Sequence, residues 1–193
     1  MGPNAAIQLL NVLPLAADPE TVRRIIVTAG VEDWAAEAPT DMVEERPVAA
    51  LHRATRSILD SQSALAVLAE AGSRTGDYLL ANRIPIWARA ILKAAPAAVS
   101  SRLLARAIKA HAWTFIGSGR FVCDSSSSAL NFEIWSNPFC AGEKSEAPGC
   151  VWHAAVFERL YQALVSPRAK VVETHCIARG DACCRFAVHG VRR

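Results

Sequence analysis

The first 116 residues place apolar side chains at the 3.6-residue period of helices, between residues that commonly begin and end them. Asp18-Pro19 is typical of a helix start and Gly30 of a helix end, which predicts a helix over 19–29. Gly72 is expected to end the next and longest helix. The further predicted helices cover 46–70, 77–82, 85–95 and 100–115. The N-terminal portion is therefore expected to be helical.

After Gly117-Ser118-Gly119 the apolar positions follow the period of two that strands show. The predicted strands cover 121–123, 130–135, 170–177 and 183–189, and one helix is predicted over 151–165. The serine run at 125–128 and Gly180-Asp181 are expected to form turns. Together the two halves predict an α+β fold, in which a helical N-terminal portion packs on a small, mainly antiparallel sheet. We expect a single domain over 1–193.

Composition and charge exclude several classes of function. The 193 residues are 52% hydrophobic and 20% charged, enough for one well-buried core. The 21 basic and 18 acidic residues nearly cancel and form no block of like charge, so no nucleic-acid partner is expected. No run approaches the roughly 18 apolar residues of a membrane span, which leaves peripheral contact at most. The apolar stretch 5–17 lacks a basic start, which favours a cytoplasmic protein over a secreted one.

Six cysteines without a secretory signal favour metal binding over disulfides. The most specific pattern is Cys150, Glu173, Cys176 and Cys184, in which one helix start and one hairpin can bring three sulfurs and a carboxylate together. The helix start would also lower the pKa of the Cys150 thiol. A thiolate-rich tetrahedral set selects zinc, and four protein ligands would make that zinc structural.

This ligand set has two consequences and leaves two alternatives open. Glu173 and Cys176 would face opposite sides of an unbroken strand, so a bend is expected near Thr174-His175. Cys184 shares its face with other apolar residues and is therefore assigned as the ligand, although its neighbour Cys183 is the alternative. The cysteines can also be explained as small buried hydrophobic residues, but a buried Glu173 would then lack a partner.

The same segment resembles a known family. Residues 172–186 read VETHCIARGDACCRF and, with Cys150 upstream, are similar to the signature of the 4-vinyl-reductase domain family. In sensor relatives the cysteines and the glutamate at these spacings hold zinc, and the fold resembles that of trafficking-complex subunits. The residues around Asn137–Cys140 and Cys150–Leu160 are similar to the bacteriochlorophyll-biosynthesis branch of the family. The resemblance is strongest over 121–189.

This branch implies a chlorophyll precursor as the ligand, a magnesium tetrapyrrole such as divinyl protochlorophyllide. Such a pigment needs an apolar cleft, aromatic contacts and often one axial nitrogen ligand. His111 is the best axial candidate, because it falls on the predicted apolar stripe of its helix. The candidate lining residues are Trp113, Trp135 and Trp152. A hydrogen-bonded core histidine and core tryptophans are the alternatives.

The resemblance implies a role in reduction of the 8-vinyl group or in delivery of the substrate to pathway enzymes. Gly117-Ser118-Gly119 follows a predicted helix and lacks a third glycine, so it does not fit a dinucleotide loop. We therefore favour an accessory or carrier protein over a self-sufficient reductase. A small-molecule sensor module and a scaffold that binds no pigment are alternatives, and a homodimer stays open.

Overall fold

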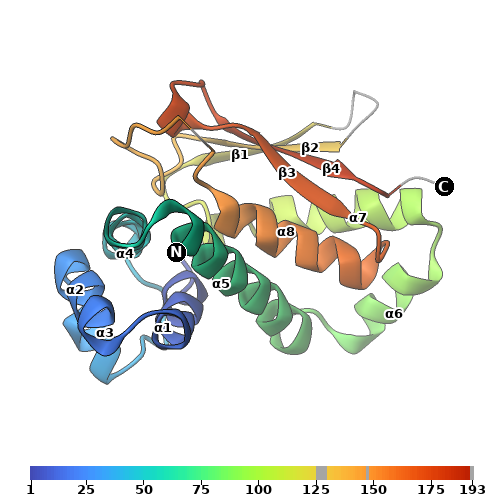
Figure 1. Cartoon of the computed structure of the whole chain (residues 1–193). Coiled ribbons are helices and arrows are strands. Elements are labelled where there is room, and N and C mark those ends of the chain that lie inside the picture. The colour runs from blue at the N-terminus through green and yellow to red at the C-terminus, as the bar shows by residue number, and fades with distance from the viewer. Residues whose placement is uncertain (125–129, 147, 192–193) are drawn as a thin grey trace.

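The chain folds into a four-stranded antiparallel sheet with its helices gathered on one side, as the computed structural model shows (Figure 1). The structure describes residues 1–124, 130–146 and 148–191. The strands are β1 (Arg120–Asp124), β2 (Leu130–Trp135), β3 (Lys170–His175) and β4 (Cys184–His189), in the order β1-β2-β4-β3. The predicted α+β class is confirmed. The serine turn predicted at 125–128 lies outside the described residues.

Residues that alternate along the strands separate a buried from a more exposed face of the sheet. In register across three strands, Phe121 pairs with Ile134, and Ile134 pairs with Cys184. Phe132 and Phe186 form the neighbouring pair and are completely buried. This is the period of two that the sequence shows, with the apolar set turned toward the helices.

Helices cover the buried face of this sheet. They are α1 (Asn4–Ala16), α2 (Pro19–Ala29), α3 (Glu32–Ala36), α4 (Glu45–Ile58), α5 (Ser61–Asn82), α6 (Ile86–Ala94), α7 (Ala97–Ala110) and α8 (Val151–Leu164). The central helix α8 packs between β3 and α5, and α5 in turn packs on α1. Figure 1 shows α1 to α4 at one end of the molecule and α6 at the other. None of the helices among the described residues is long and apolar enough to cross a bilayer.

The helix predicted over 46–70 is two helices. α4 ends at Ile58, and Asp60 begins α5 by accepting hydrogen bonds from the backbone N–H groups of Gln62 and Ser63. Gly72 does not end a helix but lies inside α5, so the separate helix predicted at 77–82 is also part of α5. A Cβ at Gly72 would overlap the Trp152 carbonyl oxygen of α8, so glycine is required here for close approach of the two helices.

Helix α7 begins earlier and ends earlier than predicted. Pro96 precedes it, and Ser100, the expected N-cap, lies inside it and donates a hydrogen bond to the Leu92 carbonyl of α6. The chain leaves α-helical geometry at His111 and forms a short 3-10 helix, Ala112–Thr114. By contrast, α2 has the predicted bounds, because Asp18 caps its start and Gly30 its end in the left-handed conformation.

Candidate metal centre

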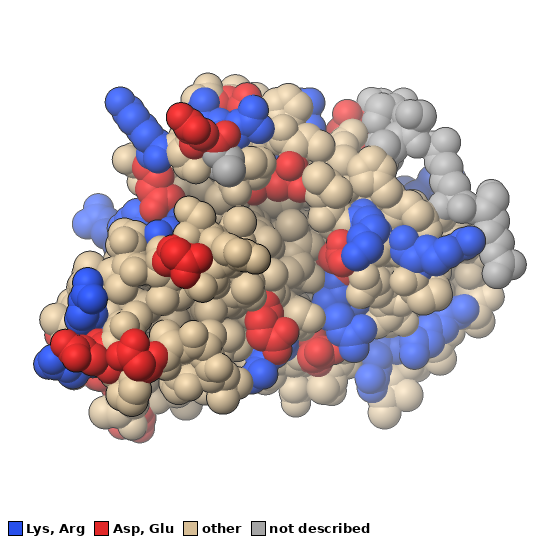
Figure 2. Space-filling model, viewed as in Figure 1, with Lys and Arg blue, Asp and Glu red and all other residues tan. Residues whose placement is uncertain are grey.

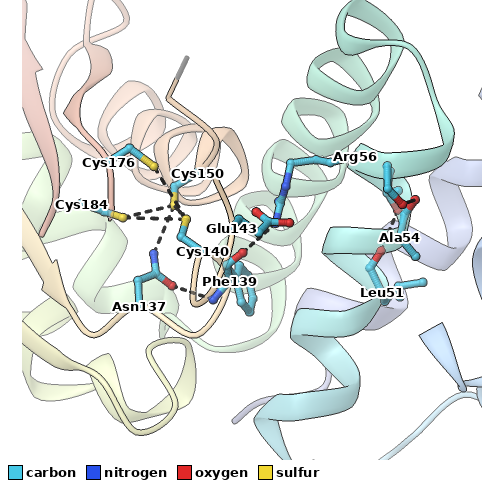
Figure 3. Close-up of polar contacts among 12 residues, drawn as sticks. Leu51, Ala54, Arg56, Asn137, Phe139, Cys140, Glu143, Cys150, Cys176 and Cys184 are labelled. Atoms are coloured by element: carbon cyan, nitrogen blue, oxygen red, sulfur yellow. Dashed lines mark hydrogen bonds and ion pairs between the residues drawn. The ribbon is translucent and has the colours of Figure 1, made fainter. Parts of the chain in front are cut away.

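Four cysteine sulfurs lie together at one end of the sheet (Figure 3). They belong to Cys140, Cys150, Cys176 and Cys184, which we call the cysteine cluster, and all lie within 4.8 Å of one another. Each residue is at most 2% exposed and none is in a disulfide. Four buried thiols that converge in this way can bind a metal ion.

The distances between the sulfurs fit a tetrahedral thiolate site. The Cys140 sulfur lies 3.8 Å from that of Cys176 and 3.9 Å from that of Cys184, and the Cys150 sulfur lies 3.4 Å from that of Cys184. Zinc–sulfur bonds of about 2.3 Å in a tetrahedron separate the sulfurs by about 3.8 Å. The Cys140 and Cys150 sulfurs are closer, at 2.7 Å, which is still longer than the roughly 2.05 Å of a disulfide.

A distortion at the end of β3 allows Cys176 to reach the cluster. The register of β3 against β4 shifts between Glu173 and His175, and this confirms the predicted bend. The chain then forms a tight turn, in which the Cys176 backbone N–H donates to the Asp181 carboxylate at 2.8 Å and Gly180 adopts a left-handed conformation. The turn returns the chain to Cys184 at the start of β4, so one hairpin supplies two sulfurs.

The loop between β2 and α8 supplies the other two sulfurs. Asn137 supports this loop from inside, because its amide nitrogen donates to the Cys150 sulfur at 3.2 Å and its oxygen accepts from the Phe139 backbone N–H. Arg56 of α4 holds the loop from outside, by bonding the Phe139 carbonyl at 2.6 Å and the Glu143 carboxylate at 2.7 Å (Figure 3). Cys140 is therefore positioned by contacts with a distant helix.

Electrostatics in the cluster favour a cation. Burial raises the pKa of the Cys150 thiol well above its usual value. Hydrogen bonds from the other three thiols, with that of Cys140 the largest, hold the pKa of Cys176 below its usual value. The dry site thus favours one thiolate stabilised by three protonated neighbours. A bound cation would stabilise the thiolate form of all four, because it supplies the positive charge that the pocket lacks.

Glu173 differs from its predicted place. The sequence pattern assigned it as the fourth ligand, whereas the structure brings the Cys140 sulfur to the other three. The Glu173 carboxylate accepts a hydrogen bond from the Cys150 backbone N–H at 2.7 Å, and its second oxygen is buried with no hydrogen-bond partner among the described residues. Burial, and next the nearby Cys176 thiolate, raise its pKa to about 9. Glu173 thus supports the start of α8 beside the cluster.

The structure separates Cys184 from the alternative, Cys183. Cys184 belongs to the cluster, while Cys183 is buried at 4% exposure outside it. Cys140 had no assigned role in the sequence analysis. The signal available for it was its place in the Asn137–Cys140 segment that carries the family resemblance, but its approach to the hairpin depends on the fold.

The four predicted pigment contacts do not lie together. His111 was expected on the buried stripe of its helix but is exposed, because the buried side of α7 consists of Ser101, Leu104, Ala105 and Ile108. Trp113 is 59% exposed. Trp135 stacks with Arg120 on the outer face of the sheet, with 4.9 Å between the guanidinium carbon and the ring centroid. Trp152 is 3% exposed and belongs to the core.

Two histidines are buried beside the loop that carries Cys140. The rings of His52 and His153 lie 4.2 and 4.9 Å from that of Phe139. The His52 Nε2 lies 3.1 Å from the Ala5 carbonyl oxygen, and its Nδ1 has no hydrogen-bond partner among the described residues. Burial lowers the pKa of His52 to about 3 and that of His153 to about 4, so both are neutral at pH 7.

A shallow apolar groove of about 460 Å³ lies between α1, α2 and α3. Its lining is Pro14, Ala17, Pro19, Val22, Arg23, Ile26, Val27, Glu32 and Ala35. The volume lies in the range of small-molecule sites. None of the predicted pigment contacts lines it.

Comparison with known proteins places this site in a wider context. The family model of the 4-vinyl-reductase domain matches residues 130–190, the stretch that holds the whole cysteine cluster. The chain is 47% identical to the bacteriochlorophyll synthase 23 kDa chain of Cereibacter sphaeroides, over 96% of this chain and 88% of that protein. It is 42% identical to the protein of the same name from Rhodobacter capsulatus, over 98% of this chain and 86% of that protein.

Solved structures with a similar fold are H-NOX proteins. An H-NOX protein from K. algicida in the unliganded Fe(II) form gives a TM-score of 0.57 at 10% identity, over 98% of this chain and 96% of that one. An H-NOX protein from S. oneidensis in the Fe(II)NO ligation state gives 0.54 at 10% identity, over 98% of both chains. At this identity the likeness concerns the fold alone.

Proposed function

The chain belongs to the family of the bacteriochlorophyll synthase 23 kDa chains, and from this membership we propose that it serves bacteriochlorophyll biosynthesis by binding a magnesium tetrapyrrole precursor. The observation that carries the proposal is the 47% identity over 96% of the chain, because a match of that extent includes the helices as well as the cysteine cluster. Divinyl protochlorophyllide is the precursor we would test first.

We also propose that the cysteine cluster holds a structural zinc ion. Cys140, Cys150, Cys176 and Cys184 would be its ligands, and four thiolates leave no coordination position for a substrate. When bound, the ion would link the β2–α8 loop to the β3–β4 hairpin. Glu173 and Asn137 would hold Cys150 in place, through its backbone N–H and its sulfur.

His111 is the proposed axial ligand, now at an exposed rather than a buried position. Its Nδ1 lies 2.9 Å from the Ala107 carbonyl oxygen, so Nδ1 carries the proton and the Nε2 lone pair is left for a magnesium ion. Trp113, two residues further on, would contact the macrocycle. Trp152 would serve the core beneath instead, since it is buried against Phe139 and His52.

We favour an accessory or carrier role over self-sufficient reduction. The Gly117-Ser118-Gly119 loop follows a helix and already holds a carboxylate, because Glu45 accepts hydrogen bonds from the Ser118 backbone N–H and hydroxyl. A phosphate of a dinucleotide would compete with that carboxylate for the same donors. A carrier would pass its precursor to other enzymes of the pathway, and these enzymes are the proposed partners.

The experiment is a titration of metal-replete protein with divinyl protochlorophyllide, followed by pigment absorbance and fluorescence. Saturable binding that His111→Ala weakens at least tenfold is expected. His189→Ala, which alters another exposed histidine, is the control and should bind normally. Absence of binding would refute the pigment role, and reduction of the vinyl group on addition of a nicotinamide donor would refute the carrier role.

A further inference from the structure

Helix α6 exposes an apolar surface that none of the described residues covers. No residue of α6 is fully buried, and Ile86, Trp87 and Ile91 are 76%, 68% and 52% exposed. Trp87 and Ile91 are four residues apart and therefore lie on the same side of the helix. A nine-residue helix with three large exposed apolar side chains is costly in water unless it meets a partner.

Helix α7 continues this surface. Val99 and Leu103, again four residues apart, are 45% and 41% exposed. The two helices pack together, because the Ser100 hydroxyl of α7 donates to the Leu92 carbonyl of α6 at 2.6 Å. We call the exposed sides of these consecutive helices the α6–α7 face.

Basic side chains flank the apolar rows on both helices. Those of the α6–α7 face are Arg89, Lys93, Arg102, Arg106 and Lys109. Residues 78–123 contain seven Lys and Arg residues and no Asp or Glu, so this segment carries +7 while the whole chain carries +3. None of the five basic residues of the face forms an ion pair within the described ranges. Figure 2 shows Lys and Arg without acidic neighbours at the end of the molecule where Figure 1 places α6.

We propose that the α6–α7 face docks on the surface of an anionic lipid bilayer. Large apolar side chains next to unpaired basic ones are the pattern of helices that lie in the plane of a membrane interface, and tryptophan favours that depth. The charge argues against a second copy of the chain as the occupant, because two such faces would bring their basic rows together. Docking goes beyond the proposed function and does not depend on pigment binding.

Vesicle flotation with purified full-length protein tests the proposal. Wild-type protein should float with phosphatidylcholine vesicles that contain about a third phosphatidylglycerol and stay behind with phosphatidylcholine alone. High salt should release it, because screening shortens the reach of the lipid charge. Each basic residue near such a surface changes partitioning about fivefold, so Arg102→Gln with Arg106→Gln should weaken it on the order of 25-fold.

Matched controls carry the same changes elsewhere. Arg23→Gln with Arg24→Gln removes two exposed charges from α2, and Leu15→Ser removes an apolar side chain that is 71% exposed. These controls should float like wild type, whereas Trp87→Ser with Ile91→Ser should not. Circular dichroism confirms folding in each case. The proposal is overturned if wild type does not float, if the controls lose binding equally, or if Trp87→Ser instead splits a dimer.

Discussion

Replacing Cys140 separates a four-cysteine zinc site from one that uses Glu173. Folding brings the Cys140 sulfur to those of Cys150, Cys176 and Cys184, so Cys140→Ser should remove one of four ligands. Structural zinc binds with about 10–16 kcal/mol, which is roughly 3–4 kcal/mol for each of four ligands. Because a difference of about 1.4 kcal/mol corresponds to tenfold, the zinc affinity should fall about 100- to 1,000-fold.

Glu173→Gln is the matched comparison. Glutamine keeps an oxygen that can accept from the Cys150 backbone N–H, where the carboxylate now lies at 2.7 Å. The substitution also resembles the neutral acid, which the raised pKa of about 9 favours in the absence of a metal ion. We therefore expect the affinity to change by no more than about tenfold, within the range of groups that support a ligand without binding the ion.

The assay is competition for zinc against a chromophoric chelator, with the metal content of the purified protein measured by mass spectrometry. Cys183→Ser, at a buried cysteine outside the cluster, controls for the loss of a thiol. A larger loss of affinity in Glu173→Gln than in Cys140→Ser would refute the four-cysteine assignment. Wild-type protein that binds no metal under reducing conditions would refute the zinc site itself.

Three further predictions concern stability. Gly72→Ala should destabilise by about 1–3 kcal/mol in urea unfolding, because its Cβ would overlap the Trp152 carbonyl oxygen. Below pH 6.5 the unfolded chain protonates His52 while the folded protein, with a pKa of about 3, does not. Stability should therefore fall with pH between 6.5 and 3, by up to about 1.4 kcal/mol per pH unit for this group, and His52→Gln should flatten that slope. Tyr161→Phe should cost about 1 kcal/mol, because the hydroxyl donates to the Ser101 carbonyl at 3.0 Å.

Each of these has an outcome that would contradict it. A Gly72→Ala variant as stable as wild type would mean that α5 and α8 can separate without cost. An unchanged pH slope in His52→Gln would show that another group binds the protons. Equal stability of Tyr161→Phe would mean that the Ser101 carbonyl finds another donor.

The local elements could largely be predicted from the sequence. The bounds of α2 follow from Asp18 and Gly30, and the four strands and α8 follow from apolar periodicity, because these signals lie within a few residues of the element they define. The bend in β3 was also predictable, since the odd spacing of Glu173 and Cys176 requires it. The family resemblance carried by residues 172–186 is confirmed by the match of the domain model over 130–190.

The wrong boundaries have a common physical cause. Gly72 has the composition of a helix end, but its missing side chain serves the contact of α5 with α8. His111 has the spacing of a buried stripe, but α7 is rotated so that Leu104 and Ile108 face the core. In both cases a residue's local pattern is compatible with two roles, and packing against a distant element selects one of them.

Local patterns along the chain were sufficient for the element types, the fold class, the family and three of the four residues of the cysteine cluster. The fourth residue depends on packing. Cys140 is separated from Cys176 and Cys184 by a helix, and no spacing rule connects it to them. It reaches them because Arg56 of α4 anchors its loop and Asn137 ties that loop to the Cys150 sulfur, and such contacts exist only once the helices have packed on the sheet.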